Sequence, residues 1–271
     1  MDFFIETDFF KPELTLAGGQ AFRWTKTAGN GNRYFGIAGN RPLELLFEPD
    51  GIRLIGVADN ALPFWLEYFD TGRDYKSVIE RFSQDPLLKK ACRYAYGLRL
   101  LRQEPFETLI SFIISQNNNI PRIKMIIKRL CEGFGEKIRG NHFAFPMARV
   151  LAALEPSDLE PLKCGYRAKY IIDAARKVNS GVIDLNALYQ KETEDIKQEL
   201  LKIKGVGEKV ADCVLLFAYG KSGAFPKDIW VKRVLSEFYP DGLPDCIIGN
   251  EGLAQQYLFE YIRNNHNNYK L

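Results

Sequence analysis

Residues that could do chemistry gather in the stretch IKGVGEKVADCVLLFAYGKSGAFPKD, from Ile203 to Asp228. Gly205 and Gly207 flank a valine just before an apolar helical pattern. Glycines at such a turn let backbone N–H groups point at an anion, which predicts a phosphate-binding hairpin. A plain hairpin between two helices would use the same glycines, so the turn alone leaves phosphate binding open.

Lys209 lies one turn into the helical pattern, where the positive end of the helix dipole disfavours an ammonium group. It is therefore a candidate neutral amine, the form in which lysine is a nucleophile. The alternative is a solvated lysine paired with Asp212. Asp228, nineteen residues later, follows the residues FPK, where a carboxylate caps a helix and can also stabilise a developing cation. Together, Lys209 and Asp228 suit attack on a carbon that is becoming positive.

The elements that must position these residues follow from hydrophobic periodicity. From about Thr15 to Val57, short apolar runs are cut by Gly-Asn, Asn-Gly and Asp-Gly turns, which is typical of an antiparallel sheet. After Leu62 the period becomes helical. Helices are expected near residues 74–84, 86–96, 105–116, 121–133, 147–155, 166–179, 193–203, 208–219, 228–238 and 250–264. The predicted fold class is α+β, with an N-terminal antiparallel sheet domain followed by a mostly helical domain.

The domain boundary is placed near residues 97–104. This gives an N-terminal α+β domain of residues 1–100 and a helical domain of residues 101–271. Within the second domain, residues 193–219 form a helix, a tight hairpin and a helix. Residues 220–228 form a Gly/Pro loop that ends in the aspartate.

Composition sets limits on partners and cofactors. The chain of 271 residues is 46% apolar, and its net charge of +3 permits a polyanionic partner without requiring one. Its five cysteines form no Cys-x-x-Cys pair, so we expect no metal site and no cofactor. The start MDFFIETDFFKPEL is unlike a signal peptide, and no apolar run approaches the ~18 residues that span a bilayer. We expect an intracellular monomer without membrane contacts, cytoplasmic with the nucleoid if prokaryotic and nuclear if eukaryotic.

The arrangement GVGEKVADC…FPKD resembles the helix-hairpin-helix DNA glycosylases, and specifically the 8-oxoguanine DNA glycosylases of the eukaryotic type. Further blocks carry the resemblance in the family's order, namely GGQAFRW (18–24), LRLLRQEPFETLISFIISQNNNIPRI (98–123), GYRAKY (165–170) and QQYLF (255–259). The hairpin alone indicates only the superfamily, whereas the blocks GQxFRW and NNNIxRI are more specific. The resemblance covers nearly the whole chain.

The resemblance implies a bifunctional enzyme of base excision repair, whose partner is double-stranded DNA containing 8-oxoguanine. Lys209 would attack C1′ of the damaged nucleotide and form a Schiff base, followed by β-elimination. Asp228 would stabilise the oxocarbenium-like transition state. Because a base inside a duplex cannot be reached, the nucleotide must be flipped out.

The resemblance also assigns the reader of the opposite strand. Asn117, Arg122 and Arg167 would hydrogen-bond the orphaned cytosine, and Tyr166 would wedge into the base stack. These residues stand at two helix starts, where ordinary caps and surface charges are also common. We therefore expect a preference for cytosine opposite the lesion.

For the lesion itself, the resemblance implies that the carbonyl of Gly19 accepts the N7–H group that 8-oxoguanine has and guanine lacks. Phe259 and Cys213 would sandwich the flipped ring, and Gln255 would read its Watson–Crick edge. As isolated residues, Phe259 and Cys213 are as well explained by the core.

Two residues depart from the family's pattern. Trp230 stands where the animal enzymes have a phosphate-contacting histidine, and Glu208 replaces a small polar residue beside Lys209. Glu208 places an extra anion near DNA. The negative charge of Glu208 opposes the phosphate binding predicted at Gly205 and Gly207.

Two other functions remain open from the sequence. A DNA-binding module could use the glycine hairpin without chemistry, in which case replacing Lys209 by glutamine would change no activity. A glycosylase of the same superfamily could act on alkylated purines or oxidised pyrimidines. Excision rates on duplexes with single defined lesions would separate these enzymes.

Overall fold

The computed structural model describes residues 1–27, 29 and 31–265. Strands β1–β5 of the described chain form one antiparallel sheet in the order β1-β5-β4-β3-β2. Their bounds are β1 Phe3–Glu6, β2 Trp24–Lys26, β3 Arg33–Ala38, β4 Arg41–Glu48 and β5 Gly51–Ile55. The sheet therefore extends beyond the predicted region, because β1 pairs with β5, with Phe3 opposite Leu54.

Helices make up most of the chain after the sheet, as predicted. Their bounds are α1 Pro12–Ala17, α2 Leu62–Tyr68, α3 Tyr75–Phe82, α4 Pro86–Tyr94, α5 Pro105–Ser115, α6 Ile120–Phe134, α7 Ala148–Ala152, α8 Ala168–Asn179, α9 Thr193–Leu201, α10 Glu208–Phe217, α11 Ile229–Phe238 and α12 Glu251–Asn265. A short hairpin of β6 (Lys137–Arg139) and β7 (His142–Phe143) follows α6. The predicted α+β architecture is confirmed, while α1, α2 and this hairpin were not predicted.

Local capping explains where several helices begin. Asp85 accepts hydrogen bonds from two N–H groups of α4, and Glu104 does the same for α5. Asn119 caps α6 through the N–H of Arg122. A proline in the first turn of each of these helices fits a position whose N–H has no intrahelical acceptor.

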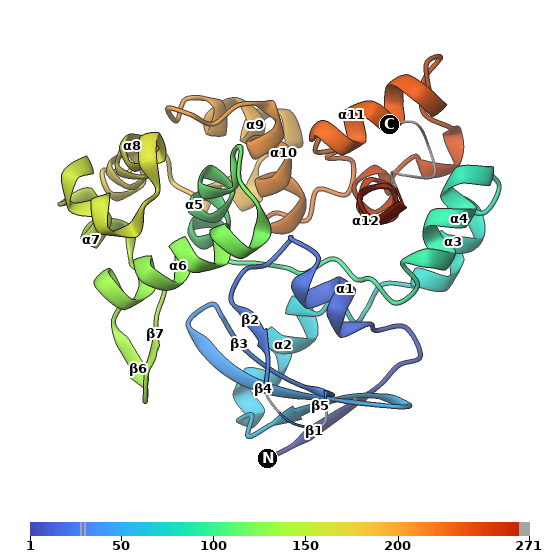
Figure 1. Ribbon diagram of the computed structural model, residues 1–271, viewed down its shortest axis with the longest axis horizontal. Coiled ribbons are helices and arrows are strands. Elements are labelled where there is room, and N and C mark those ends of the chain that lie inside the picture. Colours follow the sequence, from blue (N-terminus) through green and yellow to red (C-terminus); the bar gives the residue numbers. More distant parts are fainter. Residues whose placement is uncertain (28, 30, 266–271) are drawn as a thin grey trace.

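Two hydrophobic clusters organise the described chain. The smaller packs the sheet against α2 around Trp24, Trp65 and Phe69. The larger fills the helical body and includes α3 and α4. Helix α4 packs against α12, and α3 packs against α4. Figure 1 shows the sheet on one side of the molecule and helices α9 and α10, which carry the glycine hairpin, on the other.

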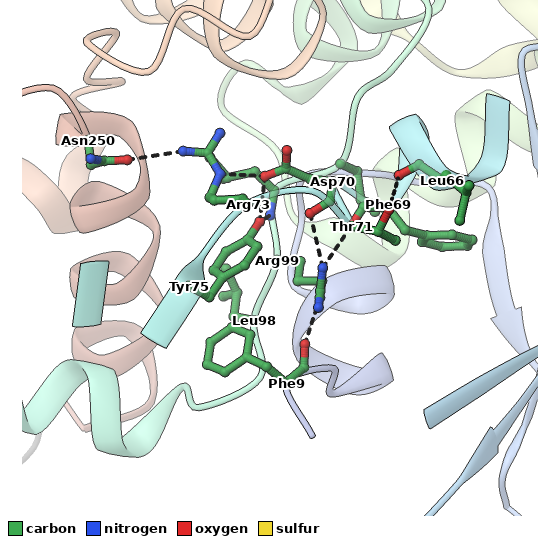
Figure 2. A network of polar contacts seen from close by, with 12 residues as sticks. Phe9, Leu66, Phe69, Asp70, Thr71, Arg73, Tyr75, Leu98, Arg99 and Asn250 are labelled. Carbon is green, nitrogen blue, oxygen red and sulfur yellow. Dashed lines mark hydrogen bonds and ion pairs between the residues drawn. The ribbon is translucent and has the colours of Figure 1, made fainter. Parts of the chain in front are cut away.

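A buried arginine joins these parts. Arg99, 6% exposed, donates to the carbonyls of Phe9 (2.6 Å) and Asp70 (3.0 Å) and to the hydroxyl of Thr7 (2.9 Å). The same network continues from Asp70 through Arg73 to Asn250, just before α12 (Figure 2). The chain between α4 and α5 is thereby tied to both clusters.

Candidate active site

The hairpin between α9 and α10 uses its two glycines for different reasons. Gly205 has a φ of +79°, and a methyl group there would lie 2.3 Å from the ring of Tyr170 on α8. Gly207 is the N-cap residue of α10, and no atom outside its neighbours lies within 4 Å of a methyl group built on it. Gly205 therefore allows the hairpin to pack closely against α8, whereas the exposed Gly207 leaves the N-terminus of α10 open to a ligand.

Polar contacts to α8 fix the hairpin further. Asp173 accepts from the backbone N–H of Lys204 (2.8 Å) and pairs with Lys177 (2.8 Å). Lys177 also donates to the carbonyl of Lys202 (2.6 Å). The loop that precedes α10 is thus held at several points by one neighbouring helix.

The side chain of Lys209, on α10, packs against α5. Its ammonium group is 5.0 Å from the ring centroid of Phe112, and Nζ lies 3.4 Å from the hydroxyl oxygen of Ser115. The side chain is half-buried. Sequence reasoning did not single out Phe112 or Ser115, although both stand in the block SFIIS that leads into QNNNI.

Lys197 on α9 engages the two acidic residues that flank Lys209. It forms ion pairs with Glu208 and with Asp212, the second at 3.1 Å. Asp212 thus has a lysine partner other than Lys209. The negative charge of Glu208 is likewise neutralised by Lys197 within the protein. This ion pair was not predicted from the sequence.

Asp228 begins α11, as expected from its position. Its carboxylate accepts a hydrogen bond from the N–H of Val231 (2.8 Å). Burial raises the pKa of Asp228, while that hydrogen bond and the positive charges of Lys209 and Arg263 act in the opposite direction. The loop before it packs against α12, where Gly252 donates its N–H to the carbonyl of Ser222 (2.8 Å). The charge of Lys209, on α10, thus acts on Asp228 at the start of α11.

The residues predicted to hold the lesion come from α10 and α12. Cys213, one turn after Lys209, is buried, and burial raises its pKa to about 11, with Lys209 partly offsetting that effect. Gln255 is 2% exposed and its side-chain oxygen accepts from Gln256 (2.6 Å). Phe259 is half-buried one turn further along α12.

Gly19 follows α1 with a φ of +108°, and a methyl group there would lie 3.0 Å from the side chain of Ile120. The next residue, Gln20, is buried and donates to the carbonyl of Arg99 (2.7 Å). Phe22 then packs edge-on against Phe112, at 5.8 Å between ring centroids. The block GGQAFRW is therefore in contact with the helix that borders Lys209.

The residues predicted to read the opposite strand form a second group at the starts of α6 and α8. Asn117, with a φ of 46°, lies 3.3 Å from the hydroxyl of Tyr166, which is 47% exposed. Arg122 is exposed and donates to the carbonyl of Lys163 (3.3 Å). These side chains are available at the surface for a partner.

Arg167 occupies a different environment from its predicted companions. It is 3% exposed, and its guanidinium donates to the carbonyls of Gln116, Asn117 and Cys164. Its guanidinium carbon lies 4.6 Å from the ring centroid of Tyr166. In the protein alone, Arg167 thus braces the loop that carries Asn117, and contact with a base would require some of these bonds to be exchanged.

The described residues contain neither a cluster of metal-ligating side chains nor a helix that could span a membrane. In that part of the chain, no group of three or more His, Cys, Asp or Glu side chains lies close enough to share a metal ion. All five cysteines lie in this part and are buried, without disulfide bonds. No helix within it has both the length and the apolar composition needed to span a membrane.

A helix–hairpin–helix that presents a lysine, followed by a Gly/Pro loop ending in an aspartate, defines the class of helix-hairpin-helix base excision glycosylases. Comparison with known families agrees with this class. Residues 3–109 match the family described as 8-oxoguanine DNA glycosylase, N-terminal domain, and residues 110–242 match the HhH-GPD superfamily base excision DNA repair protein. The chain belongs to the 8-oxoguanine DNA glycosylase family.

Individual relatives support the assignment. The crystal structure of Clostridium acetobutylicum 8-oxoguanine glycosylase/lyase with double-stranded DNA containing cytosine opposite 8-oxoguanine has a TM-score of 0.88 and 35% identity, covering 97% of this chain and 98% of that one. A probable N-glycosylase/DNA lyase of Methanothermobacter thermautotrophicus is 30% identical over 85% of this chain and 83% of its own. The N-glycosylase/DNA lyase of Saccharomyces cerevisiae is 39% identical over 53% of this chain, and the match spans 42% of the yeast protein.

Proposed function

We propose that this protein removes 8-oxoguanine from duplex DNA, preferably opposite cytosine, and then cleaves the strand at the resulting site. The observation that carries the proposal is the position of Lys209 against Phe112 and Ser115, where its charge acts on both Asp228 and Cys213. We infer that it acts as a monomer where the genome lies, in the nucleoid of a prokaryotic cell or the nucleus of a eukaryotic one.

In the proposed reaction, the neutral amine of Lys209 attacks C1′ of the flipped nucleotide as the bond to the base breaks. The base leaves with the bonding electrons and takes up a proton. The Schiff base that forms after the sugar ring opens permits loss of the 3′ phosphate by β-elimination. Asp228 stabilises the positive charge that develops on the sugar, because its buried carboxylate is poorly screened by water.

The lesion pocket would lie between the turn at Gly19 and helices α10 and α12. The carbonyl of Gly19 would accept the N7–H of 8-oxoguanine and repel the N7 lone pair of guanine. Phe259 and Cys213 would face the two sides of the flipped ring. The bond from Gln256 orients the amide of Gln255, which would then read the Watson–Crick edge.

The second group would hold the strand opposite the lesion. Tyr166 would fill the space that the flipped nucleotide vacates, since its ring is exposed at the start of α8. Asn117 and Arg122 would hydrogen-bond the orphaned cytosine, which offers both donors and acceptors. Arg167 would join them on DNA binding or continue to brace the loop. The phosphate of the damaged strand would lie at the N-terminus of α10, near Gly205 and Gly207.

Borohydride trapping tests this function. The wild-type protein is expected to form a covalent product with an 8-oxoguanine·cytosine duplex, because reduction captures the Schiff base, and Lys209→Gln is expected to form none while still binding the duplex. The trapping is repeated with each of the four bases opposite the lesion, and cytosine is expected to give the fastest reaction. A wild-type protein that binds DNA without trapping would contradict the enzymatic assignment, and equal rates for the four bases would contradict the role given to Asn117 and Arg122.

A further inference from the structure

The turn at Gly19 is anchored firmly on its C-terminal side. Gln20 is 2% exposed, and its amide donates to the carbonyls of Thr15 (3.0 Å) and Arg99 (2.7 Å). It also accepts from the N–H of Leu101 (2.9 Å). These bonds fix the residue after Gly19, but a carbonyl is held in place only if the chain before it is fixed too.

Arg263 on α12 supplies an anchor on the N-terminal side. Its Nη1 donates to the carbonyl of Gly18 at 3.1 Å, and its Nη2 pairs with Glu260 at 2.7 Å. Glu260 is itself buried, with a side chain 7% exposed, and its other oxygen accepts from Asn264 (2.9 Å). The guanidinium is therefore held by its own helix while it binds the turn.

The same guanidinium lies close to other parts of the site. Its central carbon is 4.9 Å from the ring centroid of Phe259, and its charge lowers the pKa of Asp228 against the larger effect of burial. A methyl group on Gly19 would lie 3.9 Å from Nη1. Arg263 thus contacts both the turn that is proposed to bind the N7–H edge of the damaged base and the aromatic ring that is proposed to face one side of it.

We propose that Arg263 is a positioning residue that sets discrimination between 8-oxoguanine and guanine. This inference rests on the function proposed above. At the Gly19 carbonyl, 8-oxoguanine would make an attractive contact and guanine a repulsive one. A loop that could move by a few tenths of an ångström would relieve the repulsion from guanine. By tying Gly18 to the helix of Phe259, Arg263 keeps the distance between carbonyl and ring fixed.

The contacts of Arg263 favour this role over binding of a DNA phosphate. Both terminal nitrogens of the guanidinium already have protein acceptors, and one of those acceptors is a buried carboxylate. A phosphate would be repelled by Glu260 at the place where it would have to approach. The cation is therefore used within the protein.

The test compares Arg263→Met and Arg263→Lys with the wild-type protein. Arg53→Met is the matched control, because Arg53 forms an ion pair with Glu48 on the sheet, away from the hairpin. Two quantities are measured for each protein. The first is the ratio of its affinities for 8-oxoguanine·cytosine and guanine·cytosine duplexes, and the second is strand cleavage at a preformed abasic site, which needs Lys209 but no damaged base.

Arg263→Met is expected to lower the affinity ratio by about tenfold or more, the effect of misplacing one discriminating hydrogen bond. Cleavage at the abasic site is expected to stay within about twofold of wild type, since the lysine is untouched. Arg263→Lys should recover part of the ratio, because one ammonium cannot match the forked geometry of a guanidinium. Arg53→Met should change neither quantity.

An unchanged affinity ratio in Arg263→Met would overturn the proposal. A parallel loss of discrimination and abasic-site cleavage would overturn it as well, because it would indicate a general structural or DNA-binding role. If Arg263→Met does not fold, Glu260→Gln replaces it, since it weakens the hold on the guanidinium and keeps its shape. A wild-type protein that binds the two duplexes equally would instead contradict the proposed function.

Discussion

At the scale of single residues, Asp228 combines two roles that make opposite demands on its surroundings. As the N-cap of α11 it accepts a hydrogen bond from Val231, which any capping side chain could do. As the proposed partner of a developing cation it must stay ionised in a buried place, and burial raises its pKa. Replacing it by asparagine separates the two roles, because asparagine caps a helix but carries no charge.

Asp228→Asn is expected to lower the single-turnover rate of base release on the order of 10²–10³-fold, as when one transition-state contact is removed. Its melting temperature should stay close to that of wild type, whereas Asp228→Ala should lose about 1 kcal/mol of stability with the cap. Thermal unfolding and quenched-flow kinetics measure the two effects. Equal rates for Asp228→Asn and wild type would remove the proposed electrostatic role.

The raised pKa of Asp228 also gives the pH dependence a definite sign. Base release should fall as the pH drops through that raised pKa, above the usual value of about 3.9 for aspartate. Because the folded state holds this proton more tightly than the unfolded state, the contribution of Asp228 to stability is full at low pH and declines as the pH rises. As the pH rises, the rate of base release thus increases while the contribution of Asp228 to stability declines. The rate of base release by Asp228→Asn should not show this fall at low pH.

At the scale of elements, the two glycines of the hairpin between α9 and α10 have different roles. The positive φ of Gly205 and its contact with Tyr170 serve packing, while the open position of Gly207 serves the approach of a ligand. Lys197 adds an electrostatic part, since its pairs with Glu208 and Asp212 reduce the negative charge that DNA would meet.

Gly205→Ala is expected to lower the stability of the protein by about 1–3 kcal/mol, because the new methyl group meets a ring and the backbone is strained. Gly207→Ala should leave the melting temperature nearly unchanged and weaken binding to an abasic-site duplex. Thermal unfolding and titration with the duplex in parallel measure both variants. Equal losses of stability in the two variants would contradict this division.

At the scale of the whole molecule, the chain between α4 and α5 joins the sheet to the helical body through Arg99. Its guanidinium donates to the carbonyls of Phe9, before α1, and Asp70, just after α2 (Figure 2). It also donates to the hydroxyl of Thr7. Gln20, beside the proposed lesion carbonyl, bonds to the backbone of the same chain segment. The arrangement therefore links the position of the lesion turn to the junction of the two clusters.

Arg99→Met is expected to reduce the free energy of unfolding by about 2–4 kcal/mol, because buried acceptors lose their donor. Arg53→Met, which breaks a more exposed pair between neighbouring strands, should cost no more than about 1 kcal/mol. Urea denaturation of both variants measures the difference. Similar losses in the two variants would show that the Arg99 network contributes little to stability.

The sequence by itself determined the order of the sheet and the helices, the ranges of the long helices, and the stretch of chain that contains both Lys209 and Asp228. These features depend on short-range rules, since periodicity, capping and turn residues act within a few positions of the chain. The same local rules place Asn117, Arg122 and Tyr166 at helix starts. Their roles at the site remain predictions for the experiments above.

Only the tertiary structure decided which distant residues meet. It pairs β1 with β5, places α4 beside α12, buries Arg167 under the loop of Asn117 and joins Lys197 to Glu208. It also brings Arg263 to Gly18, a contact between residues 245 positions apart. Such contacts depend on the path of the whole chain and on the burial of charge that packing imposes, and neither is encoded within a local window of sequence.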